Sequence, residues 1–253
     1  MQGPTLPGEK LKGLSTLGEH RDKLKAVRIT TAGAPPSPTT ILAMEEKGFR
    51  IVHVYGLTET SPLLTVNRMR SEWDDLTPEE QATRLVRAGQ PVIGCTVRID
   101  DDGEVLVRSN VVLEGYWDQP EETSIALRDG WFHTGDIGRL DSTGRLTIKG
   151  RKKEMIVLAD GRNVFPEDVE RALLRAPGVK DAAVIGLPAE GGERVHAVLL
   201  LEAAADPETA VSTANATLED HQKIRSYTRW SEGELPRTEG TRKLKRRELR
   251  SRL

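Results

Sequence analysis

The sequence predicts a mixed fold in which an α/β region is followed by a strand-rich segment and then by a compact α+β domain. Three patterns along the 253 residues support this prediction. Strands and a helix alternate in the first part, apolar and polar residues alternate in the middle, and an amphipathic helix with short apolar strands comes last. The polar segment Lys149–Lys153 lies between the second and third patterns, so we place a domain boundary there.

The first region is expected to contain a parallel strand–helix–strand unit. Val27–Ile29 has the apolar character of a short buried strand. Ser37-Pro38 is typical of a helix start, because serine caps the first amides and proline is tolerated at the first helical position. We expect this helix to end at Lys47-Gly48 and a second strand to follow at Ile51–Val54.

The capping box Thr77–Glu80 then predicts another helix, which Gly89 closes. Beyond it, apolar residues alternate in Thr96–Asp100, and the turn at Asp102-Gly103 returns the chain along Glu104–Arg108. This pattern predicts a β-hairpin.

A second turn at Ser142–Gly144 separates two further short strands, which predicts a small barrel-like or curled antiparallel sheet. In the last region a helix is expected to begin at Phe165-Pro166 and to stop at Pro177-Gly178. Ala182–Ile185 and Val195–Leu201 are predicted strands, and a second helix is expected around residues 208–220.

Composition excludes some classes of protein. The 37 basic residues nearly balance the 39 acidic ones, which argues against a general nucleic-acid-binding protein. No apolar run reaches the ~20 residues of a membrane span, and the first residues lack the order of a secretory signal, so we expect no transmembrane segment and a cytoplasmic location. The single cysteine, Cys95, cannot form an internal disulfide.

Polar, glycine-containing segments at strand ends are candidates for binding chemistry. Tyr55–Thr60 offers an aromatic ring for stacking, a glycine, a hydroxyl for phosphate and a carboxylate for Mg²⁺. The alternative is a capped turn in which Thr58 and Glu59 only satisfy backbone donors. In Trp131–Asp136 the final carboxylate can accept both hydroxyls of a ribose, whereas a structural hydrogen bond is the favoured interpretation of His133.

Two basic segments complete the set of candidates. Gly150–Glu154 is cationic, and its alternative interpretation is a solvated linker. Seven of the eleven residues in Arg242–Arg252 are basic, so a polyanion-binding tail is an alternative there. This tail lacks aromatic residues and the whole chain lacks net positive charge, which favours a small phosphate ligand over a nucleic acid.

These segments, in this order, resemble the acyl-adenylate-forming family, which includes acyl-CoA synthetases, firefly-luciferase-type enzymes and the adenylation domains of peptide synthetases. Tyr55–Glu59 resembles the family's aromatic-Gly-x-Thr-Glu motif, Thr134–Asp136 its ribose motif and Gly150–Ile156 its hinge motif. Asp160–Glu170 resembles the segment after the hinge, and Pro236–Lys243 resembles the segment with the adenylation lysine.

The resemblance implies a two-step ligase. A carboxylate attacks the α-phosphate of ATP to give an acyl-adenylate and pyrophosphate, and the thiol of CoA or of a carrier then takes the acyl group and releases AMP. By motif position, Thr58 holds phosphate and Glu59 ligates Mg²⁺. Asp136 and Arg151 hold the ribose, and Lys243 bridges the carboxylate and the α-phosphate.

The same resemblance implies roles for a second set of residues. Gly33-Ala34-Pro35 and Tyr55 would flank the adenine and the acyl chain, with Gly56 also at the nucleotide. Lys153 would be the hinge about which the last domain rotates between the two steps, and Gly161 would lie on the CoA side.

The lysine segment departs from the family pattern. The usual lysine stands four residues after the threonine of Pro-x-Thr, and Arg242 occupies that place here. Lys243 restores the usual spacing to Arg246 and Leu249, so we infer a one-residue insertion and assign Lys243.

A second departure concerns the first 29 residues, which lack the Ser/Thr/Gly-rich phosphate loop of the family; Gly13–Gly18 is the nearest candidate. We therefore expect the carboxyl-terminal portion of a synthetase, acting as a homodimer or together with a missing amino-terminal part. The expected domains are a remnant of the large α/β nucleotide-binding domain (1–89), the strand-rich subdomain (90–150), the hinge (151–153) and a small mobile α+β domain (154–253).

Three functions remain open at this point. The first is an acyl-CoA synthetase, and Ser71–Trp73, Asp75–Glu79 and Glu239–Lys243 favour a fatty-acyl type. The second is a non-catalytic remnant that binds a nucleotide or CoA. The third is an interaction module with a basic tail, against which the balanced charge and the motif order count.

Overall fold

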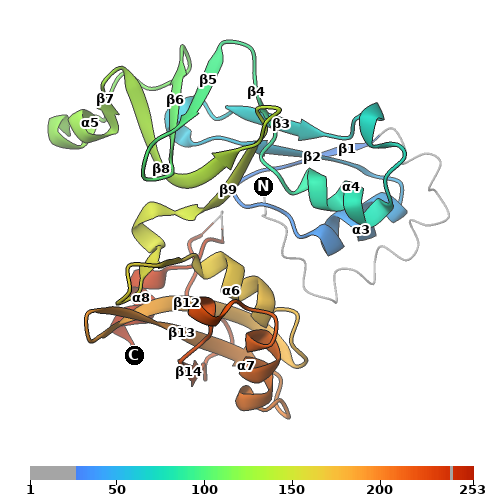
Figure 1. Ribbon diagram of the computed structural model, residues 1–253, viewed down its shortest axis with the longest axis vertical. Coiled ribbons are helices and arrows are strands. Elements are labelled where there is room, and N and C mark those ends of the chain that lie inside the picture. The colour runs from blue at the N-terminus through green and yellow to red at the C-terminus, as the bar shows by residue number, and fades with distance from the viewer. Residues whose placement is uncertain (1–26, 240–241) are drawn as a thin grey trace. The chain divides into compact units, whose positions relative to one another are not determined.

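The computed structural model describes residues 27–239 and 242–253 and contains two compact units (Figure 1). Contacts divide the chain between Ile148 and Lys149. The phosphate-loop candidate Gly13–Gly18 lies outside the described residues. No helix in the described part of the chain is long and apolar enough to cross a membrane.

The first unit begins with a four-stranded sheet in the order β1-β2-β3-β4. Its strands are β1 (Arg28–Thr31), β2 (Arg50–Tyr55), β3 (Thr65–Arg68) and β4 (Gln90–Pro91). β1 and β2 are parallel and are joined through α3 (Pro38–Glu46), which confirms the predicted strand–helix–strand unit. α3 packs beside α4 (Pro78–Leu85), and apolar residues of both helices meet Ile51 of β2 in one core.

Local capping chemistry explains where these helices begin. The Ser37 hydroxyl accepts a hydrogen bond from the Thr40 amide at 3.0 Å, ahead of proline at the first helical turn. At α4, the Thr77 hydroxyl and the Glu80 carboxylate each accept the other residue's backbone amide, which is the predicted capping box.

The second sheet of this unit has the order β5-β6-β8-β7, with β9 paired to β8. Its elements are β5 (Cys95–Ile99), β6 (Glu104–Ser109), α5 (Pro120–Ala126), β7 (Leu127–Arg128), β8 (Trp131–Leu140) and β9 (Leu146–Arg151). The β5–β6 hairpin is confirmed, with Val97 opposite Val107. The barrel-like expectation is wrong, because β7 is only two residues long and pairs with β8 alone among the described strands, so the sheet stays open.

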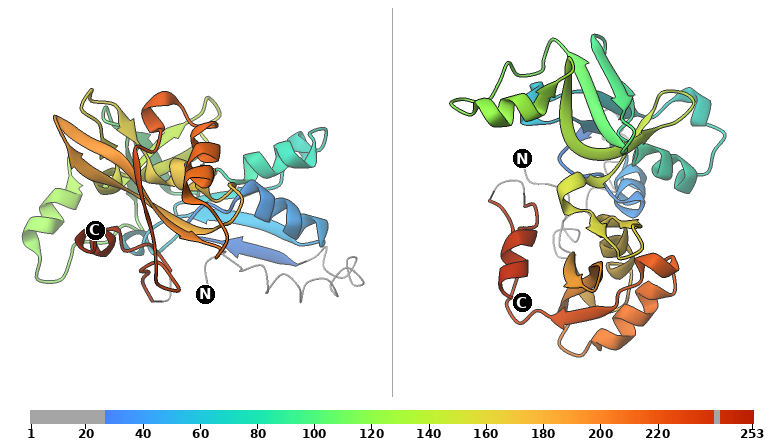
Figure 2. Two further views of the ribbon diagram at one scale, coloured as in Figure 1. Left: turned by 90° about the horizontal axis from the view of Figure 1, so that it is seen from below. Right: turned by 60° about the vertical axis from the view of Figure 1, so that its left-hand side comes forward.

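The second unit is built on a three-stranded sheet (Figure 2). β12 (Val179–Ala189) and β13 (Gly192–Leu201) are antiparallel, and β14 (Ser226–Arg229) runs parallel to β13. The two predicted strands are therefore present and longer than expected. A two-stranded sheet of β10 (Ile156–Val157) and β11 (Asn163–Val164) precedes them.

Helices cover both faces of this three-stranded sheet. α6 (Pro166–Leu173) and α7 (Pro207–Asn215) share a core with Ala182 and Val184 of β12. Residues of the opposite face, such as Ala183, pack with Leu249 of α8 (Arg246–Ser251). This alternation along β12 is the period expected of a strand that is buried on both faces.

The helix expected over 208–220 ends earlier than predicted, at Asn215. The Asn215 side chain explains the end, because its amide donates to the Ile224 carbonyl at 3.2 Å and its oxygen accepts the Ile224 amide at 2.8 Å. These bonds turn the chain toward β14, and Asp220–Gln222 forms a separate 3₁₀ turn.

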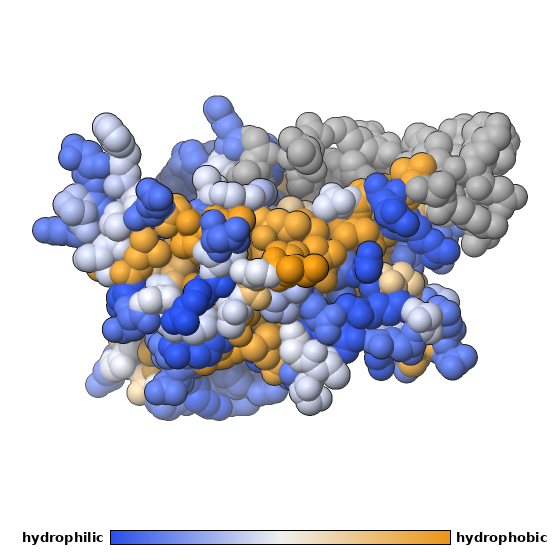
Figure 3. Space-filling model, turned by 90° about the horizontal axis from the view of Figure 1, so that it is seen from above, coloured by the Kyte–Doolittle hydropathy of each residue, from blue (hydrophilic) through white to orange (hydrophobic). Residues whose placement is uncertain are grey.

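Some apolar surface of the first unit stays exposed. Ile93, Trp117 and Ile125 are each more than half exposed. Figure 3 shows apolar residues gathered on one face of the molecule. The described residues of the first unit therefore do not bury all of its large apolar side chains.

Candidate functional site

The segment after β2 is shaped by a glycine. A Cβ added at Gly56 would lie 1.7 Å from the Pro62 carbonyl oxygen, so no larger residue fits this close approach. The Leu57 amide then donates to the Thr60 hydroxyl at 2.9 Å, which starts the 3₁₀ turn Thr58–Thr60. Thr60 therefore caps the turn, whereas the alternative interpretation gave the capping to Thr58 and Glu59.

Thr58 is exposed and Glu59 is half-buried on this turn. The Tyr116 hydroxyl donates to Glu59 Oε1 at 3.2 Å, and the Leu113 amide donates to the Glu59 carbonyl at 2.8 Å. The 113–116 segment thus holds Glu59 through one contact with its carboxylate and one with its backbone. The sequence analysis missed Tyr116, although an aromatic pair after Gly115 was a signal for it.

The Glu59 carboxylate is suited to supply one ligand of a Mg²⁺ ion. Among the described residues no group of three or more His, Cys, Asp or Glu side chains is arranged to hold a metal ion. Mg²⁺ commonly takes one or two carboxylates and completes its octahedron with water and substrate phosphates. A single glutamate next to the exposed Thr58 hydroxyl fits that pattern.

The structure joins two of the predicted motifs directly. The Tyr55 hydroxyl at the end of β2 donates to Asp136 Oδ2 on β8 at 2.7 Å. Asp136 is 5% exposed. Its backbone amide donates to the Thr134 hydroxyl at 3.1 Å, and that hydroxyl donates to the Val105 carbonyl at 2.7 Å. The carboxylate is therefore held on a rigid strand beside an aromatic ring.

Glu104 supports the same motif from the neighbouring strand. Its Oε1 accepts the Gly135 amide at 2.9 Å, where Gly135 has a φ of +70°. Its Oε2 lies 3.4 Å from Nδ1 of His133. Both side chains are buried, so His133 makes the structural hydrogen bond that was favoured over an acid–base role. The sequence analysis did not identify Glu104, since its partners are 29 and 31 residues away.

Gly33-Ala34-Pro35 lies on the exposed loop after β1. Gly33 has a φ of +88°, which favours glycine. Because β1 and β2 are parallel with Thr31 opposite His53, this loop and Tyr55-Gly56 leave the sheet at the same edge. In open α/β sheets, that carboxyl edge is where ligands bind. The two predicted nucleotide segments are thus neighbours by topology.

The remaining predicted residues belong to the second unit. Arg151 ends β9, and Lys153 is exposed in the 3₁₀ turn Lys152–Glu154 that follows. Gly161 is exposed with a φ of +79°, and its amide closes a turn onto the Leu158 carbonyl at 2.9 Å. The hinge and CoA-side roles of Lys153 and Gly161 remain predictions.

Lys243 lies on one arm of a short two-stranded ladder. The Thr238 amide donates to the Lys243 carbonyl at 2.8 Å, and the Lys243 amide donates to the Thr238 hydroxyl at 3.0 Å. Arg237 bridges to Leu244 at the next position. The Lys243 backbone is therefore fixed, while its side chain is exposed.

The neighbouring Arg242 differs from Lys243 in its contacts. Arg242 has a φ of +57° and its guanidinium pairs with Glu234. The ion pairs found among the described residues include that of Arg242 and include none of Lys243. This difference favours Lys243 over Arg242 as the group presented to an anionic ligand.

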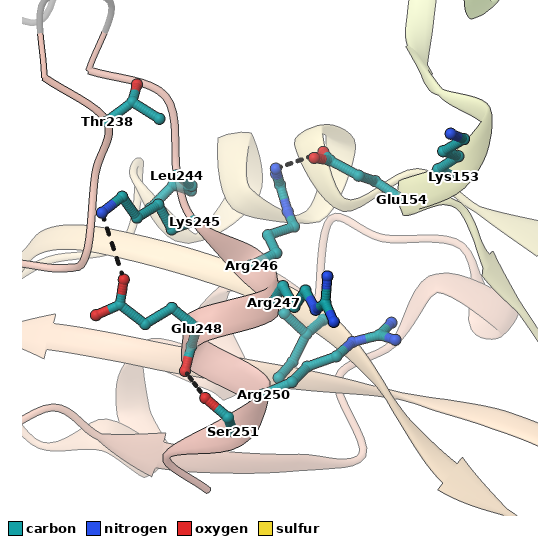
Figure 4. A pocket seen from close by; sticks show the side chains of 11 residues that line it. Lys153, Glu154, Thr238, Leu244, Lys245, Arg246, Arg247, Glu248, Arg250 and Ser251 are labelled. Carbon is teal, nitrogen blue, oxygen red and sulfur yellow. Dashed lines mark hydrogen bonds and ion pairs between the residues drawn. The ribbon is translucent and has the colours of Figure 1, made fainter. Parts of the chain in front are cut away.

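A cavity of about 740 Å³ opens beside α8 in the second unit (Figure 4). Its lining includes Lys153, Glu154, Thr238 and the first residues of α8. In Figure 4 the Arg246 side chain extends to Glu154, with which it forms an ion pair. Residues from the predicted hinge and from the lysine segment therefore line one cavity.

Comparison with known families gives two matches in succession. Residues 7–117 match the model of the AMP-binding enzyme family, and residues 168–241 match its C-terminal domain. Together these matches cover more than half of the chain.

Among curated proteins, a 2-succinylbenzoate–CoA ligase from Geobacillus kaustophilus is 36% identical over 249 residues, which cover 94% of this chain and 48% of that protein. A long-chain-fatty-acid–CoA ligase from Mycobacterium bovis is 45% identical over 139 residues, which cover 55% of this chain and 21% of that protein. The chain thus spans about half or less of the length of these relatives.

Among solved structures, the O-succinylbenzoate coenzyme A synthetase of Bacillus subtilis in complex with ATP and magnesium superposes with a TM-score of 0.77 at 25% identity. The superposition covers 93% of this chain and 50% of that protein. The agreement extends over nearly all of this chain.

Proposed function

Since the chain belongs to the adenylate-forming family of AMP-binding enzymes, we propose that it takes part in activating a carboxylic acid with ATP and in passing the acyl group to the thiol of coenzyme A. The observation that carries this proposal is the hydrogen bond between Tyr55 and Asp136. It joins an aromatic face to a buried carboxylate at the carboxyl edge of the sheet, which suits the adenosine part of a nucleotide.

In the first step a carboxylate oxygen forms a bond to the α-phosphorus as the bond to pyrophosphate breaks. Asp136 accepts hydrogen bonds from the ribose hydroxyls, and Arg151 adds a donor to the same sugar. Tyr55, Gly56 and the loop Gly33-Ala34-Pro35 flank the adenine and the acyl group. The rigid contacts of Asp136 support this role, because a preorganised group holds its ligand without further loss of freedom.

Charge on the phosphates is the main electrostatic demand of this step. The Thr58 hydroxyl donates to a phosphate oxygen, and Lys243 places its ammonium between the attacking carboxylate and the α-phosphate. Mg²⁺, when bound, neutralises phosphate charge, and Glu59 is the carboxylate that would hold it. Tyr116 keeps Glu59 oriented through the 3.2 Å hydrogen bond.

In the second step the thiol sulfur bonds to the acyl carbon and AMP leaves. Gly161 lies on the CoA side in this proposal, and its turn is exposed, with no atom beyond its chain neighbours within 4 Å of the place where a Cβ would lie. Lys153 is the hinge that exchanges the first arrangement for the second. Lys153 is exposed and lies near the start of the second unit, shortly after the division between Ile148 and Lys149, which supports a hinge there.

We propose a fatty acid as the acyl substrate and a cytoplasmic location, where ATP and CoA are available. The likeness to a fatty-acid–CoA ligase supports the fatty acid, and the likeness to succinylbenzoate ligases supports an aromatic acid as the alternative. In the longest natural reading frame that contains this sequence, trapping the acyl-adenylate with hydroxylamine across a series of fatty and aromatic acids distinguishes them. Preference for aromatic acids would overturn the fatty-acyl assignment.

Calorimetry with AMP tests the nucleotide site on the chain itself. We expect the chain to bind AMP, Asp136→Asn to weaken binding tenfold or more, and the exposed Asp141→Asn to leave it unchanged. We further expect AMP binding without appreciable pyrophosphate release from ATP and Mg²⁺, because no phosphate loop was recognised in the sequence. Absence of AMP binding by the unmodified chain would overturn the proposal.

A further inference from the structure

One arginine at the start of α8 gathers three carboxylates. Arg246 Nη1 lies 2.6 Å from Glu154 Oε2, and Arg246 Nη2 lies 2.8 Å and 2.9 Å from the two oxygens of Glu170. Glu167 Oε1 is 3.6 Å from the same nitrogen. Arg246 Nε also donates to the Val184 carbonyl at 3.2 Å. One side chain therefore connects the 3₁₀ turn Lys152–Glu154, helix α6 and strand β12.

The cluster is shielded from water. The Arg246 side chain is 13% exposed and that of Glu170 is 11% exposed. Glu167 Oε2 is buried and has no hydrogen-bond partner among the described atoms. Burial raises the pKa of Glu170 to about 7 and raises the pKa of Glu167, in both cases against the lowering effect of Arg246. A buried guanidinium with this many partners is a rigid junction, unlike an exposed ion pair.

A short series of backbone hydrogen bonds joins the chain just before Arg246 to the segment Pro236–Lys243. The Lys245 amide donates to the Pro236 carbonyl at 2.9 Å, immediately before α8. The ladder from Arg237 to Leu244 continues from there to the Thr238–Lys243 pair. The other arm is anchored where Arg237 Nη2 donates to both oxygens of Asp181, at 2.9 Å and 2.8 Å. Each arm of the ladder thus begins at an arginine bound to the sheet.

We infer that Arg246 is a positioning residue, which holds the Lys243 backbone in register against Thr238 by fixing the start of α8 to Glu154 and Glu170. The inference rests on the proposed role of Lys243 in the first step. It does not place Arg246 in contact with the nucleotide. Its action passes through the backbone of Leu244 and Lys245, so its loss displaces the Lys243 ammonium without removing any charge from that residue.

The structural part of the inference is tested on this chain by amide hydrogen exchange. Arg246→Met keeps most of the apolar stem, and we expect it to lower the protection of the Thr238 and Lys245 amides tenfold or more. The amide of Val198, in the centre of β13, should keep its protection. The matched control is Arg252→Met, which removes an exposed arginine with two carboxylate partners at the end of the same helix. Unchanged protection at Thr238 and Lys245 would overturn the inference.

The functional part uses the longest natural reading frame that contains this sequence. We expect Arg246→Met to lower the kcat of adenylate formation tenfold or more with the KM for ATP unchanged. Thioester formation from supplied acyl-adenylate should stay within twofold. Equal losses in both steps, together with lower protection of Val198, would show a general defect in folding and would overturn the positioning role.

Arg246→Lys covers the case in which the methionine variant does not fold. A single ammonium cannot reproduce the fork to Glu154, Glu170 and the Val184 carbonyl, so we expect a loss between those of the methionine variant and the control. Full retention of Thr238 protection in this variant would count against the inference. If the unmodified enzyme forms no adenylate, the proposed function fails, while the exchange measurement still decides whether Arg246 holds the ladder.

Discussion

Replacing Glu170 by glutamine should flatten the pH dependence of stability in the second unit. Burial raises the pKa of Glu170 from 4.5 to about 7. A carboxyl with a raised pKa stabilises the fold while it is protonated. This contribution is complete below pH 4.5, the pKa of the unfolded chain, and is lost as the pH rises through about 7.

The size of the effect follows from the two pKa values. A rise from 4.5 to about 7 corresponds to ~3 kcal/mol of unfolding free energy lost between acidic and alkaline pH. Glutamine keeps an oxygen for the Val184 amide, which Glu170 accepts at 2.9 Å, and it does not titrate. The variant should therefore lack this part of the pH dependence, even if its stability at any one pH differs.

Urea unfolding of the chain at pH 5, 6, 7 and 8 measures this difference. The unfolding free energy of the unmodified chain minus that of Glu170→Gln should fall by roughly 2–3 kcal/mol from pH 5 to pH 8, which is most of the total. Glu190→Gln, an exposed change in the turn between β12 and β13, is the control and should show no trend. A constant difference between the chain and Glu170→Gln would refute the reasoning, because Glu170 would then be ionised throughout.

The remaining predictions concern the candidate site. In the longest natural reading frame, Lys243→Ala should lower adenylate formation roughly a hundredfold and spare thioester formation from supplied adenylate; a larger loss from Arg242→Ala would show that the insertion is misplaced. Lys153→Pro should impair one half-reaction far more than the other, because proline fixes φ at a hinge, and equal small losses would indicate a solvated linker. Gly56→Ala should lower the unfolding free energy by roughly 2 kcal/mol or more, since its Cβ meets the carbonyl of the next turn; normal urea unfolding would contradict that contact. Tyr55→Phe should weaken AMP binding about tenfold, because it removes the charge-assisted hydrogen bond to the Asp136 carboxylate, which is proposed to bind the ribose; an unchanged affinity in calorimetry would contradict this.

Local chemistry made parts of the fold predictable. Ser37 and Thr77 mark the starts of helices, because each hydroxyl accepts a hydrogen bond from the amide three residues later. The β5–β6 hairpin follows from the turn at Asp102-Gly103. Whether the second sheet closes into a barrel was not predictable in this way. Closure depends on whether distant strand edges meet, and here the short β7 leaves the sheet open.

The candidate site shows the same limit. The order of the motifs identified Tyr55 and Asp136 as candidates, and side-chain chemistry suggested a role for each. Their direct hydrogen bond, the support from Glu104 and the gathering of carboxylates at Arg246 arise from tertiary packing. The types of residue along a chain do not tell which residues of distant strands lie opposite one another. These contacts could therefore be found only in the structure.

The bond between Tyr55 and Asp136 spans 81 residues of sequence. Closing so long a loop is entropically costly and is repaid only when both sheets of the first unit are in place. During synthesis, the segment containing Tyr55 leaves the ribosome well before β8 exists. We therefore expect the ability to bind a nucleotide to appear late and cooperatively in folding. A nucleotide would then stabilise the folded unit and bind its folding intermediates only weakly.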